Sequence, residues 1–92
     1  MGNTKQKILT TEEVRRKGSR YLLEELGNRL WAGVPAFDEA RQQWTVSIHS
    51  HSVRPEVELG KLVLNPDGEV VRAPSRSAVR RVLRQYQPSS RR

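Results

Sequence analysis

The chain has 92 residues, enough for one compact core, so we expect a single domain. Hydrophobic residues make up 35% and charged residues 29%, and this balance predicts a thin core under a large wetted surface. The absence of cysteine excludes a disulfide scaffold, a thiolate metal site and cysteine nucleophilic chemistry. No run approaches the roughly 18 apolar residues of a membrane span, and no export signal is visible, so we expect a cytoplasmic protein without membrane insertion.

The formal net charge of +7 is spread unevenly along the chain. Residues 1–33 carry seven Lys or Arg against four Glu, residues 34–72 carry four against six acids, and residues 73–92 carry six Arg and no acid. A polybasic end attracts phosphate, anionic lipid or an acidic protein surface through a field that weakens as salt rises. Charge alone does not choose among these three partners.

An amphipathic helix is predicted over residues 11–26. Thr10 and Glu13 have the spacing of a capping box, in which each side chain accepts a hydrogen bond from the other residue's backbone N–H. The apolar positions that follow recur at helical spacing: Val14, Tyr21, Leu22 and Leu26. Residues 1–9 are predicted to be a flexible N-terminus.

Two strands are predicted next. Along residues 29–37 the apolar side chains alternate, and one side of the strand holds Leu30, Ala32, Val34 and Ala36. Pro35 has no N–H and therefore predicts an edge position or a strand end. After a polar connection, residues 44–49 form the clearest strand, with Trp44 as a core anchor. Its two sides hold Trp44, Val46 and Ile48 against Thr45, Ser47 and His49.

Residues 57–64 are predicted to form a third strand after an exposed loop. A bulge at Gly60 would keep Leu62 and Leu64 facing the core. Residues 65–68, Asn-Pro-Asp-Gly, predict a turn that leads into a last short strand at residues 69–71.

A second amphipathic helix is predicted after Pro74, with Ser75 as its cap. Its apolar positions follow the i, i+3, i+4, i+7 spacing: Val79, Val82, Leu83 and Tyr86. Residues 88–92 are predicted to be a flexible basic tail.

The order helix, four short strands, helix predicts the α+β class, with an antiparallel sheet in a two-layer sandwich and one domain over residues 10–87. An amphipathic helix followed by Trp44-Thr45-Val46-Ser47-Ile48, by Leu62-Val63-Leu64 and by Asp67-Gly68-Glu69-Val70-Val71 resembles the PepSY-like small α+β domains. The likeness spans about residues 10–72. It implies a binding or regulatory module without a catalytic centre.

His49 and His51 occupy alternate positions of a strand, so their side chains point the same way, and neutral imidazole binds zinc, copper or nickel. Two ligands do not make a metal site, and no spacing rule joins Glu56 or Glu58 to them. We therefore expect solvated surface histidines and no metal. An enzyme that uses His49, His51 and a nearby carboxylate stays a third hypothesis.

No other catalytic constellation is visible. The acids fall in predicted turns or on solvated strand faces, where nothing would shift their pKa toward acid–base work. The chain has no phosphate-cradling glycine loop and no serine elbow. We predict that the protein is not an enzyme, with no catalytic residue, no cofactor and no small-molecule substrate.

Arg76, Arg80 and Arg84 form an i+4 row on the predicted second helix, with Arg81 beside it. Guanidinium groups one turn apart can hold successive phosphates or an acidic groove. The alternative to a binding surface is that the row is only the solvent-exposed face of a helix. Basic residues near the C-terminus of a helix interact favourably with the helix dipole. The absence of any acid on this helix favours a binding surface, because like charges four residues apart repel.

The first functional hypothesis is a small non-catalytic interaction module, such as a regulatory or accessory subunit of a larger cytoplasmic protein, with self-association as a variant. The alternative is a nucleic-acid-binding protein in which the four arginines contact the phosphate backbone with little sequence preference. Against nucleic acid, the chain lacks a zinc finger, RNP motifs, a GXXG loop and a convincing helix-turn-helix. Its aromatic residues are predicted to be engaged in packing.

Overall fold

The computed structural model describes residues 9–27 and 29–86. In chain order its elements are α1 (Thr11–Tyr21), the π-helical turn η1 (Leu22–Leu26), β1 (Leu30–Ala32), β2 (Ala36–Asp38), β3 (Gln43–Ser50), β4 (Gly60–Leu64), β5 (Val70–Arg72) and α2 (Arg76–Tyr86). The predicted tail at residues 88–92 and residues 1–8 of the predicted N-terminus lie outside the described residues. Leu9, the last residue of that predicted N-terminus, is buried in the core.

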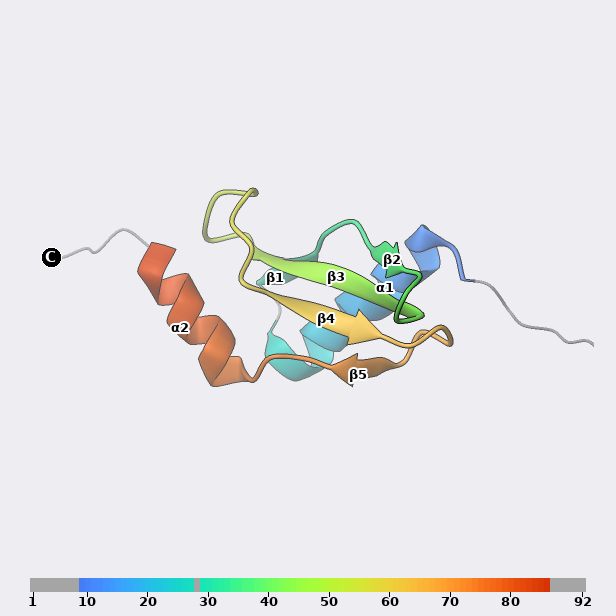
Figure 1. Cartoon of the computed structure of the whole chain (residues 1–92). Coiled ribbons are helices and arrows are strands. Elements are labelled where there is room, and N and C mark those ends of the chain that lie inside the picture. Colours follow the sequence, from blue (N-terminus) through green and yellow to red (C-terminus); the bar gives the residue numbers. More distant parts are fainter. Residues whose placement is uncertain (1–8, 28, 87–92) are drawn as a thin grey trace, which may run out of the picture.

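The predicted α+β class and two-layer arrangement are confirmed. The sheet is antiparallel with strand order β1-β3-β4-β5, and β2 pairs with the other half of β3. Figure 1 shows α1 and η1 behind the sheet and α2 beyond one end of it. Among the described elements, no helix covers the front face, so this face of the sheet is open (Figure 1).

The predicted capping box starts α1. The Thr10 N–H donates to Glu13 Oε1 at 2.9 Å, and the Glu13 N–H donates to Thr10 Oγ1 at 3.1 Å. The helix turns Val14 and Gly18 toward the sheet and then widens into η1, where the Gly27 N–H donates to the Leu22 carbonyl oxygen at 2.7 Å. The helical segment ends at Leu26, as predicted.

The core lies between α1 and the inner face of β3 and β4. Burial alternates along β3, and Trp44, Val46 and Ile48 point inward as predicted. Leu62 and Leu64 of β4 pack beside them and have no exposed surface. Burying one such aliphatic side chain stabilises the fold by roughly 1.5–3 kcal/mol, so the alternation sets which face of the sheet α1 covers.

The prediction of one continuous strand over residues 29–37 is wrong in the middle of this range, where the structure has two strands, β1 and β2, separated by a short break. Ala32 pairs with Ile48, and Ala36 pairs with Thr45. Ala32 and Ala36 are four residues apart, whereas their partners in β3 are three residues apart, so the edge segment contains one extra residue. A one-residue insertion reverses the faces of the side chains beyond it. Val34 is therefore 77% exposed, and Phe37 contacts Trp44 with ring centroids 5.1 Å apart. The position predicted from Pro35, an edge or a strand end, is confirmed, since Pro35 lies between β1 and β2 and both of these strands pair only with β3.

The second half of the sheet differs from prediction at the start of β4. This strand begins at Gly60 rather than at residue 57, and its register shift lies at Val63 and Leu64, opposite β5. The predicted turn is confirmed by a 2.9 Å bond from the Gly68 N–H to the Asn65 carbonyl oxygen. Gly68 has φ +90°, a backbone conformation that glycine accepts without strain.

The predicted second helix is confirmed as α2. Ser75 caps it, because its Oγ accepts a 3.1 Å hydrogen bond from the Ala78 N–H. Val79 is buried, and Val82 and Leu83 are partly buried against the core. Tyr86 was expected on the apolar stripe, yet it is 55% exposed because the last turn of α2 lies beyond the end of the sheet (Figure 1).

Candidate binding surface

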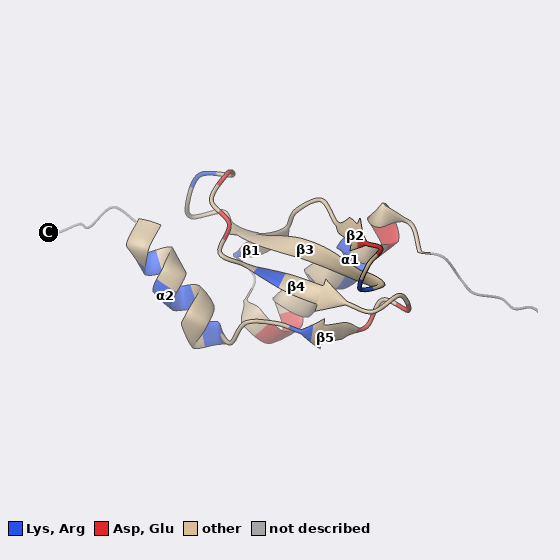
Figure 2. Ribbon diagram, viewed as in Figure 1, with Lys and Arg blue, Asp and Glu red and all other residues tan. Residues whose placement is uncertain are grey.

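The four arginines predicted to bind a partner all lie on α2, and all four are exposed. Arg76, Arg80 and Arg84 share one side of the helix at steps of about 6 Å along its axis, because four residues make little more than one turn. Arg81 lies further round the helix. In Figure 2 the charged positions of α2 are all blue, the colour of Lys and Arg, and none is red, the colour of Asp and Glu.

The arginines of α2 make no ion pair in the part of the chain that the structure describes. All ten acidic residues of the sequence lie within residues 9–27 and 29–86. The ion pairs found there join Arg20 to Glu24, Arg54 to Glu56 and Lys61 to Glu58. The charges of Arg80, Arg81 and Arg84 are therefore left for water or for another molecule.

Arg76 differs from the other three. Its Nε donates a 2.8 Å hydrogen bond to the backbone carbonyl oxygen of Glu25, which ties α2 to η1. Arg76 is also the first residue of α2, where the helix dipole disfavours a cation. The dipole therefore accounts for Arg84 in the last turn and not for Arg76, whose position is explained by this tertiary bond.

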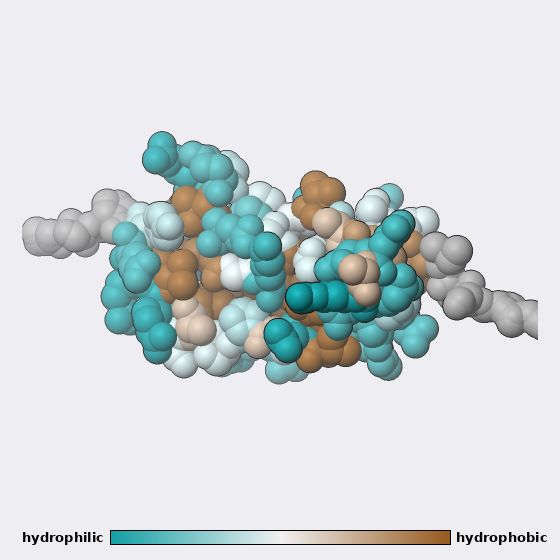
Figure 3. Space-filling view, viewed as in Figure 1, coloured by the Kyte–Doolittle hydropathy of each residue, from teal (hydrophilic) through white to brown (hydrophobic). Residues whose placement is uncertain are grey.

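A groove of about 250 Å³ lies between α2 and η1. Its lining combines apolar side chains, here called the floor, with Arg29, Arg76 and Arg80, here called the rim, and it also includes the buried Ser50. The floor residues are Leu26, Leu30, Val79 and Leu83. Figure 3 shows hydrophobic surface on the side of α2 toward the sheet and hydrophilic surface on its outer side. Arg29 could not be found from the sequence, because only the tertiary docking of α2 places this residue in the same groove as Arg76 and no local pattern joins them.

His49 lies on the open face of the sheet and is half-buried, so the expectation of a solvated side chain is wrong for it. Its Nδ1 lies 2.9 Å from the carbonyl oxygen of Val57, and its Nε2 lies 2.7 Å from Ser47 Oγ. A carbonyl only accepts, so Nδ1 carries a proton. In the neutral ring, Nε2 then accepts from the Ser47 hydroxyl. Trp31 stacks on the imidazole with centroids 4.4 Å apart, whereas His51 is exposed, as expected.

Ser47 and His49 have the spacing of a nucleophile and its base, but the edge strand covers the hydroxyl. A Cβ on Gly33 would overlap Ser47 Oγ and lie 2.9 Å from His49 Nε2, so the Gly33 backbone lies directly against this pair. The arrangement fits a structural role, in which the Ser47–His49 pair supports the edge of the sheet. Within the described residues, no group of three or more His, Asp or Glu could hold a metal ion.

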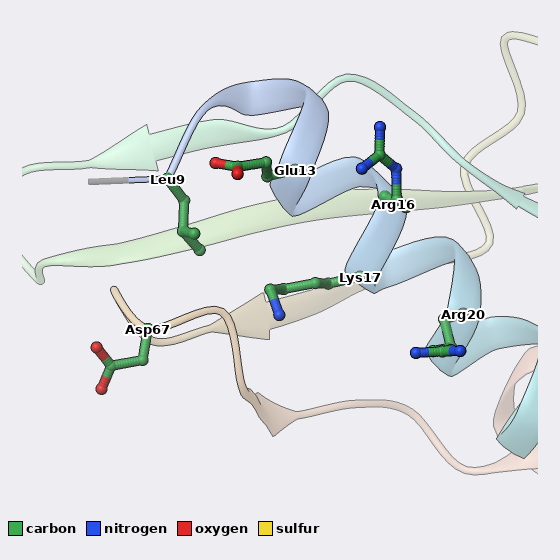
Figure 4. Close-up of a pocket in the computed structure, with 6 residues that line it drawn as sticks. All are labelled: Leu9, Glu13, Arg16, Lys17, Arg20 and Asp67. Atoms are coloured by element: carbon green, nitrogen blue, oxygen red, sulfur yellow. The ribbon is translucent and has the colours of Figure 1, made fainter. Parts of the chain in front are cut away.

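A second hollow, of about 530 Å³, lies beside α1 and is lined by both signs of charge. Its lining residues are Leu9, Glu13, Arg16, Lys17, Arg20 and Asp67. Figure 4 shows the Arg16 guanidinium directed away from Lys17 and the Asp67 carboxylate turned away from the helix. These charges do not converge on one point, so α2 and its groove remain the candidate surface.

Comparison with protein-family models, curated proteins and solved structures finds no match for this chain. The resemblance to PepSY-like domains stays a prediction. No helix among the described residues is long and apolar enough to span a membrane.

Proposed function

We propose that the protein is a non-catalytic interaction module that binds an acidic protein partner through the arginines of α2. The observation that carries the proposal is that Arg80, Arg81 and Arg84 are exposed on an ordered helix and make no ion pair with any described residue. A regulatory or accessory subunit of a larger cytoplasmic protein fits this role. So does the binding or regulatory role implied by the PepSY-like resemblance.

The energetics of α2 favour a partner that brings carboxylates. Arg76 with Arg80, and Arg80 with Arg84, are like charges four residues apart, and each such pair destabilises a helix by roughly 0.2–0.5 kcal/mol. A carboxylate beside them removes this repulsion. Carboxylates also suit the flat, forked guanidinium group, which donates two parallel hydrogen bonds to one acid.

The partner we propose is a different molecule rather than the chain's own remaining residues or a second copy. Residues 1–8, 28 and 87–92 contain Lys and Arg but no Asp or Glu, so they supply no side-chain carboxylate. Two copies would each bring a net charge of +7, which opposes association at low salt.

The experiment compares two triple variants of equal charge. One replaces Arg80, Arg81 and Arg84 with Ala, and the control replaces Arg16, Arg41 and Arg54 with Ala. Binding of a fluorescent polyglutamate peptide is measured by anisotropy at low and moderate salt. We expect the α2 variant to bind about tenfold or more weakly and the control to stay within about twofold of wild type. Equal weakening in both variants would reduce the effect to net charge and overturn the proposal.

Nucleic acid is the second candidate, favoured by the unpaired Arg80 and Arg84 one turn apart with Arg81 beside them. The same titration with single-stranded and duplex oligonucleotides separates the two. If an oligonucleotide binds more tightly than the polyglutamate peptide at moderate salt, and the α2 triple variant loses this binding, the second candidate replaces the first.

A further inference from the structure

We infer that the groove between α2 and η1 holds an amphipathic acidic segment of the partner. Apolar side chains of that segment fill the floor, and its carboxylates pair with Arg29, Arg76 and Arg80 on the rim. The inference rests on the proposed function, since it specifies how an acidic protein would dock beside α2.

The floor of the groove selects for apolar side chains. Leu26, Leu30 and Leu83 are only partly buried, and they surround Val79, which is 5% exposed. The volume of about 250 Å³ is smaller than the roughly 300–1,000 Å³ of pockets that enclose a small-molecule ligand. It suits a few anchor side chains that project from a larger partner, in the way an amphipathic helix lays its apolar face in a groove.

The rim selects for acids. Arg29 precedes β1, and Arg76 and Arg80 come from the first two turns of α2, so guanidinium groups from two parts of the fold border one apolar floor. Arg29 is exposed, and its side chain has no hydrogen bond or ion pair with any described residue, whereas its backbone carbonyl oxygen accepts a 3.0 Å hydrogen bond from the His51 N–H. Only the Nε of Arg76 is engaged, by the Glu25 carbonyl, so its two terminal nitrogens remain available as donors.

The lining favours a protein segment over a nucleic acid. Among the described residues, no aromatic side chain lines the groove, so bases would find no stacking platform there. Trp31 is stacked on His49 on the open face of the sheet, and Tyr86 lines a separate hollow with His51 and Val57. A phosphate backbone would pair with the rim but leave the apolar floor uncovered.

The test uses the full chain and two synthetic acidic peptides of about fifteen residues, a length that matches α2 with one turn to spare. One peptide has Leu at i, i+3, i+4 and i+7 with Glu on the flanks of this stripe. The other has the same composition in scrambled order. Affinities are measured by anisotropy, and amide chemical shifts locate the contact.

Four single variants separate the groove from the rest of the surface. Arg29→Ala and Arg80→Ala remove rim charges, and Leu83→Ser makes the partly buried floor polar. Arg41→Ala is the control, because Arg41 lies between β2 and β3, outside α2 and the groove. Circular dichroism and the melting temperature of each variant identify any that fail to fold, and conclusions rest on the folded ones.

We expect the patterned peptide to bind about tenfold more tightly than the scrambled one and to shift the amides around Leu26, Leu30 and Leu83. We also expect Arg29→Ala to weaken it several-fold, with Arg41→Ala within about twofold of wild type. If both peptides bound with equal affinity and only the α2 triple variant lost this binding, the groove would not be the docking site, and the proposed function would stand. No binding of either peptide at low salt would overturn both, and tighter oligonucleotide binding that is lost in the α2 triple variant would replace both with nucleic-acid recognition.

Discussion

Arg76 donates a 2.8 Å hydrogen bond from its Nε to the backbone carbonyl oxygen of Glu25, which lies 51 residues earlier in the chain. This bond joins the first turn of α2 to the end of η1. Together with the burial of Val79 it fixes α2 at the end of the sheet and sets the width of the groove. The position of the binding surface therefore depends on a small number of contacts.

Arg76→Ala is expected to loosen α2 without unfolding the domain. The bond is exposed, so its net contribution is modest, about 1 kcal/mol or less. Hydrogen–deuterium exchange measures the result, with faster exchange of the α2 amides and unchanged protection in β3 and β4. Arg84→Ala is the matched control, because the Arg84 side chain has no hydrogen bond or ion pair with a described residue. Equal acceleration in both variants would show that the Glu25 bond does not hold the helix.

Gly33→Ala is expected to destabilise the protein. The added Cβ overlaps Ser47 Oγ and lies 2.9 Å from His49 Nε2, so the edge strand must shift. Overpacking of this kind typically costs about 1–3 kcal/mol. Urea unfolding followed by Trp fluorescence gives the change in the free energy of unfolding.

Gly18→Ala is the control for that experiment and should have the opposite sign. A Cβ at Gly18 lies at ordinary van der Waals distances, 3.5 Å from both Leu62 Cδ1 and Val46 Cγ1. Alanine in a helix interior is more favourable than glycine by about 0.5–1 kcal/mol, so this variant should be the more stable. If Gly33→Ala were as stable as wild type, the close approach of the edge strand to Ser47 would be disproved.

Local patterns in the sequence predicted most of the fold. Thr10 and Glu13 marked the start of α1, because a capping box involves only residues three apart. The alternation at Trp44, Val46 and Ile48 predicted the inward side of β3, since period-two burial is a property of one strand. The arginines of α2 were found for the same reason, as a row on one helix.

Features that depend on contacts distant in sequence could not be predicted. The extra residue at the edge is set by pairing with β3, where the Gly33 N–H bonds to the Ser47 carbonyl oxygen at 2.9 Å, so alternation alone misplaced Val34. Two of the three partners of His49, Trp31 and Val57, come from another strand and a loop, and only Ser47 belongs to the same strand. Arg29 joined the rim of the groove only through the docking of α2.

Charge reversal at Arg80 tests the central claim, that the cations of α2 receive acids of another molecule. The affinity of the patterned acidic peptide is measured for wild type, Arg80→Glu and the control Arg41→Glu, and again with Lys replacing the flanking Glu residues of the peptide. We predict that Arg80→Glu binds the acidic peptide about tenfold more weakly than wild type and binds the Lys peptide better than wild type does, with Arg41→Glu within about twofold of wild type. Equal losses in Arg80→Glu and Arg41→Glu, or no loss in either, would contradict it.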